Sequence, residues 1–274
     1  MPRTLLFSDV DGTLLDADDR LGFTPDDLAS LAPSVELILN SSRTIPELCA
    51  LQDRLAFRAP MVAENGALVA MDAADRAPEG GYFHRVMGRR LRVFALAKPA
   101  LVVRAQVGRI AAAMGAAYDD QRDVLTRSAT AHTPAARQAL QRTHSVLFRA
   151  RVGEDAATHA AFIRRLRDEE LFVTSGGQWT AVVDGSNKGM AARWLVDALR
   201  TSRKETHRIA AIGDGENDEA LLAYAECAFV VRNDDGSWHR ALTGIPGAVP
   251  LKVHGIAGWL PTARQLSDSG SAPC

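Results

Sequence analysis

The sequence predicts an α/β fold, in which a parallel sheet has helices on both faces and a smaller α+β unit is inserted into it. Short apolar runs alternate with helical patterns near both ends of the chain, and this alternation is typical of such a sheet. The alternation is interrupted between residues 84 and 184, which indicates the insertion. The 274 residues, nearly half of them apolar, are enough to form a core of this size.

The first part of the chain, up to residue 83, alternates between short strands and helices. Thr24 is typical of a helix N-cap, and Pro25 would then occupy the first helical position. Pro46 fits the first turn of a second helix, and Glu64-Asn65-Gly66 is a turn sequence. The expected elements are strands at 4–8, 35–40, 61–63 and 68–71 and helices at 25–31 and 45–56.

The middle part, residues 84–184, combines helices and strands in a different order. Two strands joined by Ser175-Gly176-Gly177 form a predicted hairpin, because a glycine pair is typical of a tight turn. The elements expected here are helices near 101–116 and 155–170 and strands at 145–150, 171–174 and 179–183. After Lys188 we expect helices at 189–200 and 218–225 and strands at 208–212 and 228–231. The predicted domains are a discontinuous core of residues 1–83 and 185–274 and an inserted unit of residues 84–184.

The charges and the distribution of apolar residues argue against several classes of protein. The formal net charge is −1, so composition offers no electrostatic argument for binding nucleic acid or an anionic membrane. The longest apolar stretch, residues 95–117, contains Lys98, Arg104 and Arg109, which argues against a membrane span. The first residues lack a signal-peptide pattern, and the three cysteines are far apart without metal-ligand spacing. We therefore expect a cytoplasmic protein with free thiols.

Two carboxylates, Asp9 and Asp11, directly follow the first predicted strand and precede Gly12 and Thr13. Ligands of open α/β sheets bind beyond the carboxyl ends of the strands. At such a place one carboxylate can be a nucleophile or metal ligand and the other an acid or base. The alternatives are an ordinary surface turn and a calcium loop. A calcium loop is disfavoured because the acidic residues within 16–19 do not have the required spacing.

A second acidic pair, Asp214 and Asp218, lies between the predicted strand at 208–212 and the helix that follows it. One carboxylate is at the strand end and the other is at the helix start. Carboxylate oxygens placed in this way suit Mg²⁺. Taken alone, the pair also fits an ordinary acidic turn between a strand and a helix.

Two further sites offer groups that suit phosphate. Lys188 lies at a predicted helix start, where its amine can neutralise a phosphate and hold a carboxylate. Ser41, Ser42 and Arg43 follow the strand at 35–40, and their hydroxyl, backbone amide and guanidinium groups form a candidate phosphate cradle. Taken alone, Lys188 fits a surface lysine and Ser41 fits a helix N-cap. All four sites lie at strand ends or helix starts, and it is this combination that favours phosphate chemistry.

The combination resembles the haloacid dehalogenase-like superfamily of phosphatases. The residues that match the four motifs of that family are Asp9 with Asp11, Ser41, Lys188, and Asp214 with Asp218. The resemblance spans nearly the whole chain and implies a Rossmann-like core. It implies that the inserted unit is a cap that determines substrate specificity. It further implies a small-molecule phosphate ester as substrate, with no nucleic-acid or membrane partner, and Mg²⁺ as cofactor.

The resemblance also implies a role for each matching residue. Asp9 would be the nucleophile that attacks phosphorus, and Asp11 would protonate the leaving oxygen and then activate water. The implied phosphate-binding residues are Ser41, Ser42 and Lys188. The implied Mg²⁺ ligands are Asp9, Asp11 through its backbone carbonyl, Asp214 and Asp218, with Asn217 in a supporting position.

Within this superfamily the sequence is most similar to the group that acts on mannosyl-3-phosphoglycerate. That group usually has a lysine where this chain has Arg43, and this change keeps the positive charge but alters the hydrogen-bond geometry. The implied substrate-binding residues are Arg43, Asn65, Ser175, Gly176, Gly177 and Gln178. The glycine pair can form an anion-binding nest for a carboxylate or can merely permit a tight hairpin.

Other substrates and activities fit the same core. The alternative substrates are a sugar phosphate, sucrose phosphate and glucosyl-3-phosphoglycerate. The alternative activities are those of a phosphomutase and of a regulator that binds phosphate without turning it over. The sequence makes no prediction about the oligomeric state.

Overall fold

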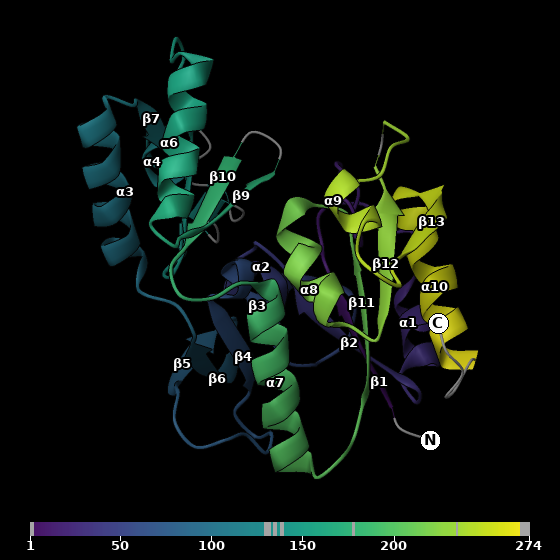
Figure 1. Ribbon diagram of the computed structural model, residues 1–274. Coiled ribbons are helices and arrows are strands. Elements are labelled where there is room, and N and C mark those ends of the chain that lie inside the picture. Colours follow the sequence, from purple (N-terminus) through teal and green to yellow (C-terminus); the bar gives the residue numbers. More distant parts are fainter. Residues whose placement is uncertain are drawn as a thin grey trace.

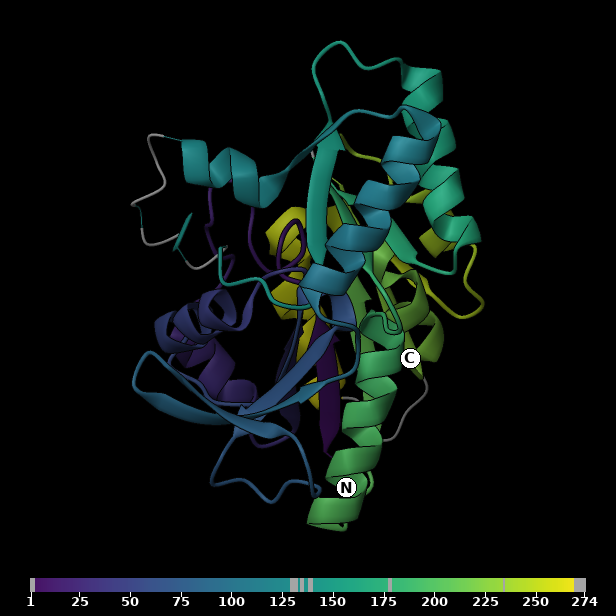
Figure 2. The ribbon, with the colours of Figure 1, turned by 90° about the vertical axis from the view of Figure 1, so that its left-hand side faces the viewer.

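A computed structural model describes residues 3–128, 133, 136–137, 140–176, 179–233 and 235–268. Within these residues the chain forms a nine-stranded sheet and a separate four-stranded sheet (Figure 1). Figure 2 shows the smaller sheet and its helices above the larger sheet. We refer to the nine-stranded sheet with its helices as the core.

The nine-stranded sheet has the strand order β13-β12-β11-β1-β2-β3-β4-β6-β5. The first six strands in this order are mutually parallel, and the remaining three pair antiparallel. Their bounds are β1 Thr4–Ser8, β2 Val35–Asn40, β3 Met61–Ala63, β4 Leu68–Asp72, β5 Tyr82–Val86, β6 Arg89–Ala95, β11 Arg208–Gly213, β12 Cys227–Arg232 and β13 Val249–His254. The predicted α/β class is confirmed, and the central strands are those that the apolar runs predicted.

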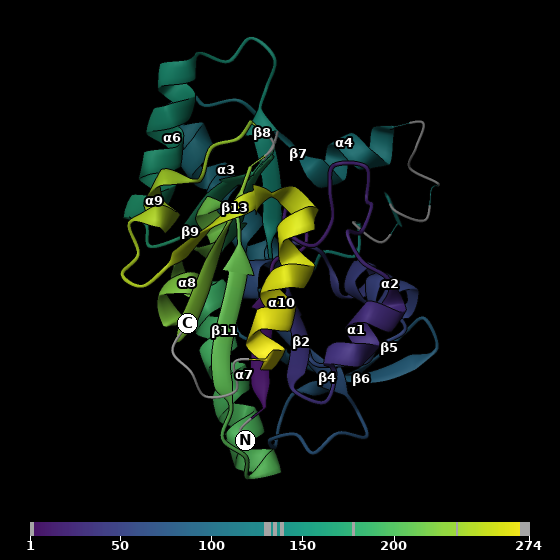
Figure 3. The same ribbon diagram turned by 90° about the vertical axis from the view of Figure 1, so that its right-hand side faces the viewer.

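Helices cover both faces of this sheet, as Figure 3 shows. One face is covered by α1 (Pro25–Leu31), α2 (Ile45–Arg54) and α10 (Trp259–Asp268). The other is covered by α7 (Lys188–Arg203), α8 (Glu219–Tyr224) and α9 (Arg240–Thr243). Alternate residues of β1 serve the two faces, because Leu6 packs with the first group whereas Leu5 and Phe7 pack with the second. Burial on both faces explains why this strand is apolar throughout.

The four-stranded sheet comes from the chain between β6 and α7. We refer to residues 96–184 as the insertion. Its strand order is β7-β8-β10-β9, all antiparallel, and the predicted hairpin of the last two strands is confirmed. Its elements are α3 Ala100–Met114, β7 Tyr118–Asp120, α4 Gln121–Arg127, β8 Val146–Ala150, α6 Ala156–Asp168, β9 Phe172–Gly176 and β10 Trp179–Val183.

Helices α3 and α6 of the insertion cover one face of the four-stranded sheet. Val146 and Phe148 of β8 and Val182 of β10 pack with side chains of α3 and α6 on that face. The residues between them, Leu147 and Ala181, point to the opposite face because side chains alternate along a strand. That opposite face is turned toward the core, where these two residues line a cavity described below.

The predicted start of the insertion at residue 84 stays a prediction, and the strand pairing around this residue bears on it. Residue 84 is His84, which lies within β5 and pairs with Leu91 of β6 in the nine-stranded sheet. β6 in turn pairs along its length with β4, so the chain leaves this sheet only after Ala95. The division into two domains and its boundaries stay predictions, and the name insertion refers here to residues 96–184, which follow β6.

Several contacts hold the insertion to the core, and the following three lie at different places along it. Lys98 and Asp184, on the two connecting segments, are joined by a backbone hydrogen bond of 2.9 Å and a side-chain ion pair of 3.0 Å. At the second attachment the buried carboxylate of Glu64 accepts hydrogen bonds of 2.8–2.9 Å from the backbone amides of residues 143–145. The third is exposed, where Glu216 of the core pairs with Arg167 of α6.

The segment that positions Glu64 has an unusual backbone. The short 3-10 helix Glu64–Gly66 has positive φ at all three residues, where only a glycine is free of strain. A Cβ on Gly66 would approach the backbone oxygen of Asn187 to 2.1 Å, so only glycine fits there. This close approach brings the start of α7 against the turn that holds the insertion.

The remaining general expectations concern membranes and cysteines. Among the described residues, no helix is both long enough and apolar enough to cross a membrane. Cys49 is a free, buried thiol, whereas Cys227 is disulfide-bonded, so the expectation of free thiols is wrong for Cys227. The cytoplasmic location stays a prediction.

Candidate active site

The predicted chemical residues meet at one edge of the nine-stranded sheet. β1 lies at its centre, and the chain proceeds in one direction through β2 and β3 and in the other through β11, β12 and β13. The loops that follow β1 and its neighbours therefore run to opposite sides and leave a crevice at the carboxyl ends of these strands. Open α/β sheets bind ligands in such a crevice. Asp9 follows β1, Ser41 follows β2 and Asp214 follows β11.

Asp9 lies at the centre of this edge and is almost fully buried, with 5% of its surface exposed. The Lys188 amine donates hydrogen bonds of 2.7 Å to Asp9 Oδ1 and to Asp218 Oδ1. Lys188 is in turn fixed at the start of α7, where Asn40 donates a hydrogen bond of 3.1 Å to its backbone oxygen. The predicted association of Asp9, Lys188 and Asp218 in space is therefore found, and Lys188 is not a surface lysine.

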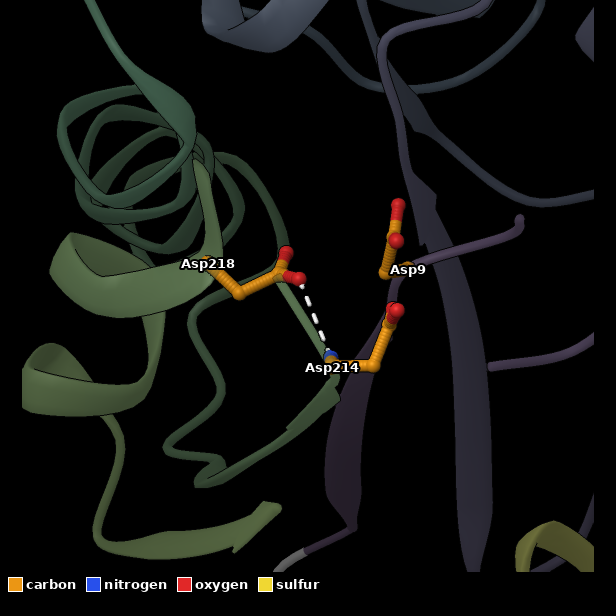
Figure 4. A group of neighbouring side chains, drawn as sticks. All are labelled: Asp9, Asp214 and Asp218. Atoms are coloured by element: carbon orange, nitrogen blue, oxygen red, sulfur yellow. Dashed lines mark hydrogen bonds between the residues drawn. The ribbon is translucent and has the colours of Figure 1, made fainter. Parts of the chain in front are cut away.

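Asp214 completes the group from the end of β11. Figure 4 shows its carboxylate beside that of Asp9, with Asp218 approaching from the other side. Thr13 donates a hydrogen bond of 2.9 Å to Asp214 Oδ1, and Asp218 Oδ2 accepts one of 3.2 Å from the backbone amide of Asp214. Gly12 has φ +81°, and a Cβ there would approach Asp214 Oδ2 to 2.6 Å. The glycine of the first motif thus leaves room for the carboxylate of the second.

The surroundings of this group disfavour the ionised form of its carboxyl groups when no cation is bound. Burial and then the charge of Asp218 raise the pKa of Asp9 well above its usual range. Burial and Asp218 also raise the pKa of Asp214 to about 6. Burial acts to lower the pKa of Lys188, but Asp218 and Asp9 outweigh it and raise that pKa. Three carboxylates face a single ammonium group, so the site has an excess of buried negative charge.

The donor set fits a divalent cation that prefers oxygen ligands. Asp9, Asp214 and Asp218 each offer a carboxylate oxygen, and these oxygens lie within 4.8 Å of one another. Hard cations such as Mg²⁺ bind carboxylate oxygens, and a cation would offset the excess negative charge. The side chain of Asp11 is not part of this group of carboxylates.

The phosphate cradle predicted after β2 is only partly open to a ligand. Ser41 is fully buried, and its hydroxyl accepts a hydrogen bond of 3.2 Å from the backbone amide of Arg43. Ser42 lines the cavity above Asp9. Ser41 therefore shapes the loop, whereas Ser42 is exposed to a bound molecule.

Asp11 and Arg43 form an ion pair at the cavity wall. The Arg43 guanidinium donates hydrogen bonds of 2.5 Å, 3.1 Å and 3.2 Å to the Asp11 carboxylate. The same guanidinium donates one of 2.6 Å to Asp19, which the sequence did not suggest as a site residue. Asp19 could not be found from local sequence, because its contact with Arg43 spans 24 residues.

Two other contacts support the site from outside the acidic group. Asn217 donates a hydrogen bond of 3.1 Å to the Asn65 side chain, and both residues line the cavity. Trp259 of α10 donates one of 2.9 Å to the Ser8 hydroxyl, which itself donates one of 2.7 Å to the Asp9 backbone oxygen. Trp259 is a positioning residue that sequence reasoning missed, because it lies 250 residues from Asp9.

A cavity of about 540 Å³ lies between the acidic edge of the core and the open face of the insertion sheet. Its core wall includes Asp9, Asp11, Arg43 and Asp214. The residues that line it from the insertion are Gln121, Arg142, Leu147, Thr174, Ser175, Trp179 and Ala181. The chain thus encloses a space of the size that small-molecule ligands occupy.

The outcome for the predicted insertion residues is mixed. Ser175 lines the cavity, and it lies within β9 rather than in the turn. Gly176 ends β9, while Gly177 and Gln178 lie outside the described residues. The sequence did not identify Arg142, because its surroundings contain no motif.

The family model of the haloacid dehalogenase-like hydrolases matches residues 6–79 and 113–243, which is most of the chain. The chain belongs to this family and is a phosphatase. The resemblance that the four motifs indicated is therefore confirmed.

The chain is also similar to individual proteins and solved structures. The chain is 25% identical to a glucosyl-3-phosphoglycerate/mannosyl-3-phosphoglycerate phosphatase of Methanococcoides burtonii, over 94% of each chain. A haloacid dehalogenase-like hydrolase from B. subtilis has a similar structure, with a TM-score of 0.63 and 16% identity over 97% of this chain and 99% of that one. The sucrose-phosphatase of Synechocystis sp. PCC6803 gives a TM-score of 0.59 and 15% identity over 97% and 98% of the two chains. The two structures support the fold.

Proposed function

We propose that the protein is a Mg²⁺-dependent phosphatase that acts through a phosphoaspartate on Asp9, with mannosyl-3-phosphoglycerate as its substrate and mannosylglycerate as its product. The observation that supports the chemistry best is the buried group of Asp9, Lys188, Asp214 and Asp218 beneath the cavity. The relative from Methanococcoides burtonii supports the substrate. The ligands proposed for Mg²⁺ are Asp9, Asp214, Asp218 and the backbone carbonyl of Asp11, with Asn217 in support.

The proposed reaction has two steps. A carboxylate oxygen of Asp9 attacks phosphorus, the ester P–O bond breaks, and Asp11 gives a proton to the leaving alcohol oxygen. Water then attacks phosphorus of the phosphoaspartate, Asp11 accepts a proton from this water, and inorganic phosphate leaves as Asp9 is regenerated. Asp11 is held by Arg43 in this structure, so substrate binding has to loosen that ion pair.

Charge is the main obstacle to the first step, because a phosphate dianion repels the attacking carboxylate. Lys188 places an ammonium group 2.7 Å from Asp9, where it can stabilise the phosphoryl oxygens as charge develops on them. A bound Mg²⁺ supplies further positive charge for the same purpose. The hydroxyl of Ser42 and the backbone amides of its loop would contact the transferring group from the cavity wall.

The insertion is proposed to act as the cap that selects the substrate. Its open sheet face closes the cavity opposite Asp9, and Ser175 and Asn65 line the cavity from its two sides. A cavity of about 540 Å³ is large enough for a glycosyl group as well as a phosphoglycerate.

The test is phosphate release from a panel of esters, measured with Mg²⁺ and with a chelator. The panel contains mannosyl-3-phosphoglycerate, glucosyl-3-phosphoglycerate, sucrose 6-phosphate and simple hexose phosphates. We expect Mg²⁺-dependent release with kcat/KM at least about tenfold higher for mannosyl-3-phosphoglycerate than for the hexose phosphates. Equal turnover of all esters would reject the proposed substrate, and Mg²⁺-independent turnover would reject the proposed cofactor.

A further inference from the structure

The two walls of the cavity present different charges to a ligand. The core wall contains several carboxylates, whereas the insertion wall contains a single ionisable side chain, Arg142, among its described lining residues. The rest of that wall is neutral, and Leu147, Trp179 and Ala181 give it an apolar surface. A ligand group that faces the insertion therefore meets one cation beside an apolar platform.

Among the described residues, no carboxylate pairs directly with the guanidinium of Arg142. Its Nη1 donates hydrogen bonds of 2.9 Å to the backbone oxygen of Ser42 and 2.8 Å to the Ser145 hydroxyl. That hydroxyl in turn donates one of 2.9 Å to the Glu64 carboxylate, which itself accepts hydrogen bonds from the backbone amides of residues 143–145. Within the described part of the chain Arg142 makes no ion pair, and its Nε, which is buried, has no hydrogen-bond partner. A guanidinium has five N–H donors, so several stay available to an anion. Residues 129–139, which precede Arg142 in the sequence, include no acidic residue.

Arg43, the other arginine among the described residues that line the cavity, differs from Arg142 because it forms ion pairs within the protein. Its guanidinium is 2.5 Å from Asp11 and 2.6 Å from Asp19, so two carboxylates already offset its charge. The acidic residues of the core wall would repel a second anionic group of a ligand. The described residues of the insertion wall include no carboxylate and would not repel it. An anion carried by the ligand therefore gains most beside Arg142.

The hydrogen bond from Arg142 to Ser42 places Arg142 beside the loop that follows β2. Ser42 belongs to the loop that faces the proposed phosphoryl site, and Arg142 reaches that loop from the insertion. Arg142 thus lines the cavity from the insertion, next to the loop that contains Ser42. This is where the alcohol part of a phosphate ester would lie.

We infer that Arg142 binds a carboxylate on the alcohol part of the substrate, and that Trp179 packs against the neutral part beside it. This inference rests on the proposed function and specifies its substrate class as phosphate esters of hydroxy acids. A carboxylate accepts two parallel hydrogen bonds from a guanidinium, which gives both affinity and orientation. A neutral alcohol would take water from the guanidinium without supplying a charge in return, which is unfavourable.

The experiment compares two esters that differ at a single group. In 3-phosphoglycerate a carboxylate replaces the terminal hydroxymethyl group of glycerol 3-phosphate. We expect Arg142→Gln to lower kcat/KM for 3-phosphoglycerate about 30-fold more than for glycerol 3-phosphate. Arg142→Lys, which keeps the charge but loses the paired donors, should give an intermediate loss. The control is Arg149→Gln, since Arg149 contacts the Trp179 ring without lining this cavity.

A second measurement separates this inference from the proposed reaction. The dissociation constants of both esters are measured calorimetrically for Asp9→Asn and for Asp9→Asn combined with Arg142→Gln. Selective loss of affinity for 3-phosphoglycerate in the double variant would support the carboxylate site even if turnover failed. Equal losses for both esters, in binding or in kcat/KM, would show that Arg142 only holds the Ser42 loop and would overturn the inference.

Discussion

The two walls of the cavity hold their charges in different ways. On the core wall, carboxylates and a buried amine are fixed by one another, and their positions depend on the ends of β1 and β11 and on the starts of α7 and α8. On the insertion wall, one arginine is held by uncharged groups and its charge stays unpaired in the described residues. The difference indicates that the core wall is built to react with a group common to all substrates, whereas the insertion wall is built to distinguish among them.

The largest effect should come from the core wall and should be the same for every substrate. Asp9→Asn keeps the size of the side chain but removes the nucleophile, so we expect kcat to fall by a factor on the order of 10⁴ to 10⁶ for all esters. The protein should remain folded, because burial and neighbouring carboxylates already disfavour the charge of Asp9.

Asp19→Asn is a matched control for this prediction, because Asp19 lines the same cavity but lies outside the acidic group. Its kcat should fall less than about tenfold. Phosphate release and thermal unfolding measured on both variants test the comparison. A substantial residual activity of Asp9→Asn would show that another group attacks phosphorus.

A smaller effect concerns stability in the absence of metal. The pKa of Asp214 is raised from 3.8 to about 6 in the folded protein, so the folded state binds this proton more tightly than the unfolded chain does. The contribution of Asp214 to folding stability therefore decreases as the pH rises from about 4 to about 6. We expect the metal-free Asp214→Asn variant to gain stability relative to the wild type over this range, as thermal unfolding at several pH values would show.

Added Mg²⁺ provides the control for the Asp214 prediction. The cation should stabilise the wild type more than Asp214→Asn, because it binds the ionised carboxylates. A difference in Tm between the two proteins that does not change between pH 4 and 7 would contradict the raised pKa.

The smallest effect should come from the exposed attachment between the walls. Glu216 accepts hydrogen bonds from Arg167 of α6 at 2.7 Å and from the backbone amide of Ser175 at 3.2 Å. Ion pairs as exposed as this one contribute little, so Glu216→Gln should change kcat/KM by less than about fivefold. Any change should be greater for a glycosylated ester that touches the insertion than for glycerol 3-phosphate. A loss comparable to that of Asp9→Asn would show that Glu216 takes part in the reaction.

The motif residues of the core wall could be predicted from sequence because they lie next to recognisable strands or helix starts. Asp9 and Asp214 follow apolar runs, and parallel strands bring such positions to the same edge. The sequence also predicted α1, α2, α7 and α8 of the core but not α9 and α10, and the cap and first-turn proline at Thr24 and Pro25 are local features.

The insertion wall and its boundary depend on pairings that local sequence does not encode. β5 is an edge strand with four exposed residues, so it lacks the apolar run that marked the central strands. Its place in the nine-stranded sheet follows from the pairing of β6 with β4, which the alternation of strands and helices could not reveal. Arg142 reaches the cavity because residues 143–145 are bound by Glu64, about 80 residues away in sequence.

The Glu64 attachment has a consequence for how product leaves. Its buried carboxylate would lose all its donors if residues 143–145 moved away, and an unpaired buried charge is costly. The attachment at Glu216 is exposed and can be replaced by water at little cost. We therefore expect opening of the cavity to begin at the Glu216 attachment and to leave the Glu64 attachment intact, so that product leaves past Glu216.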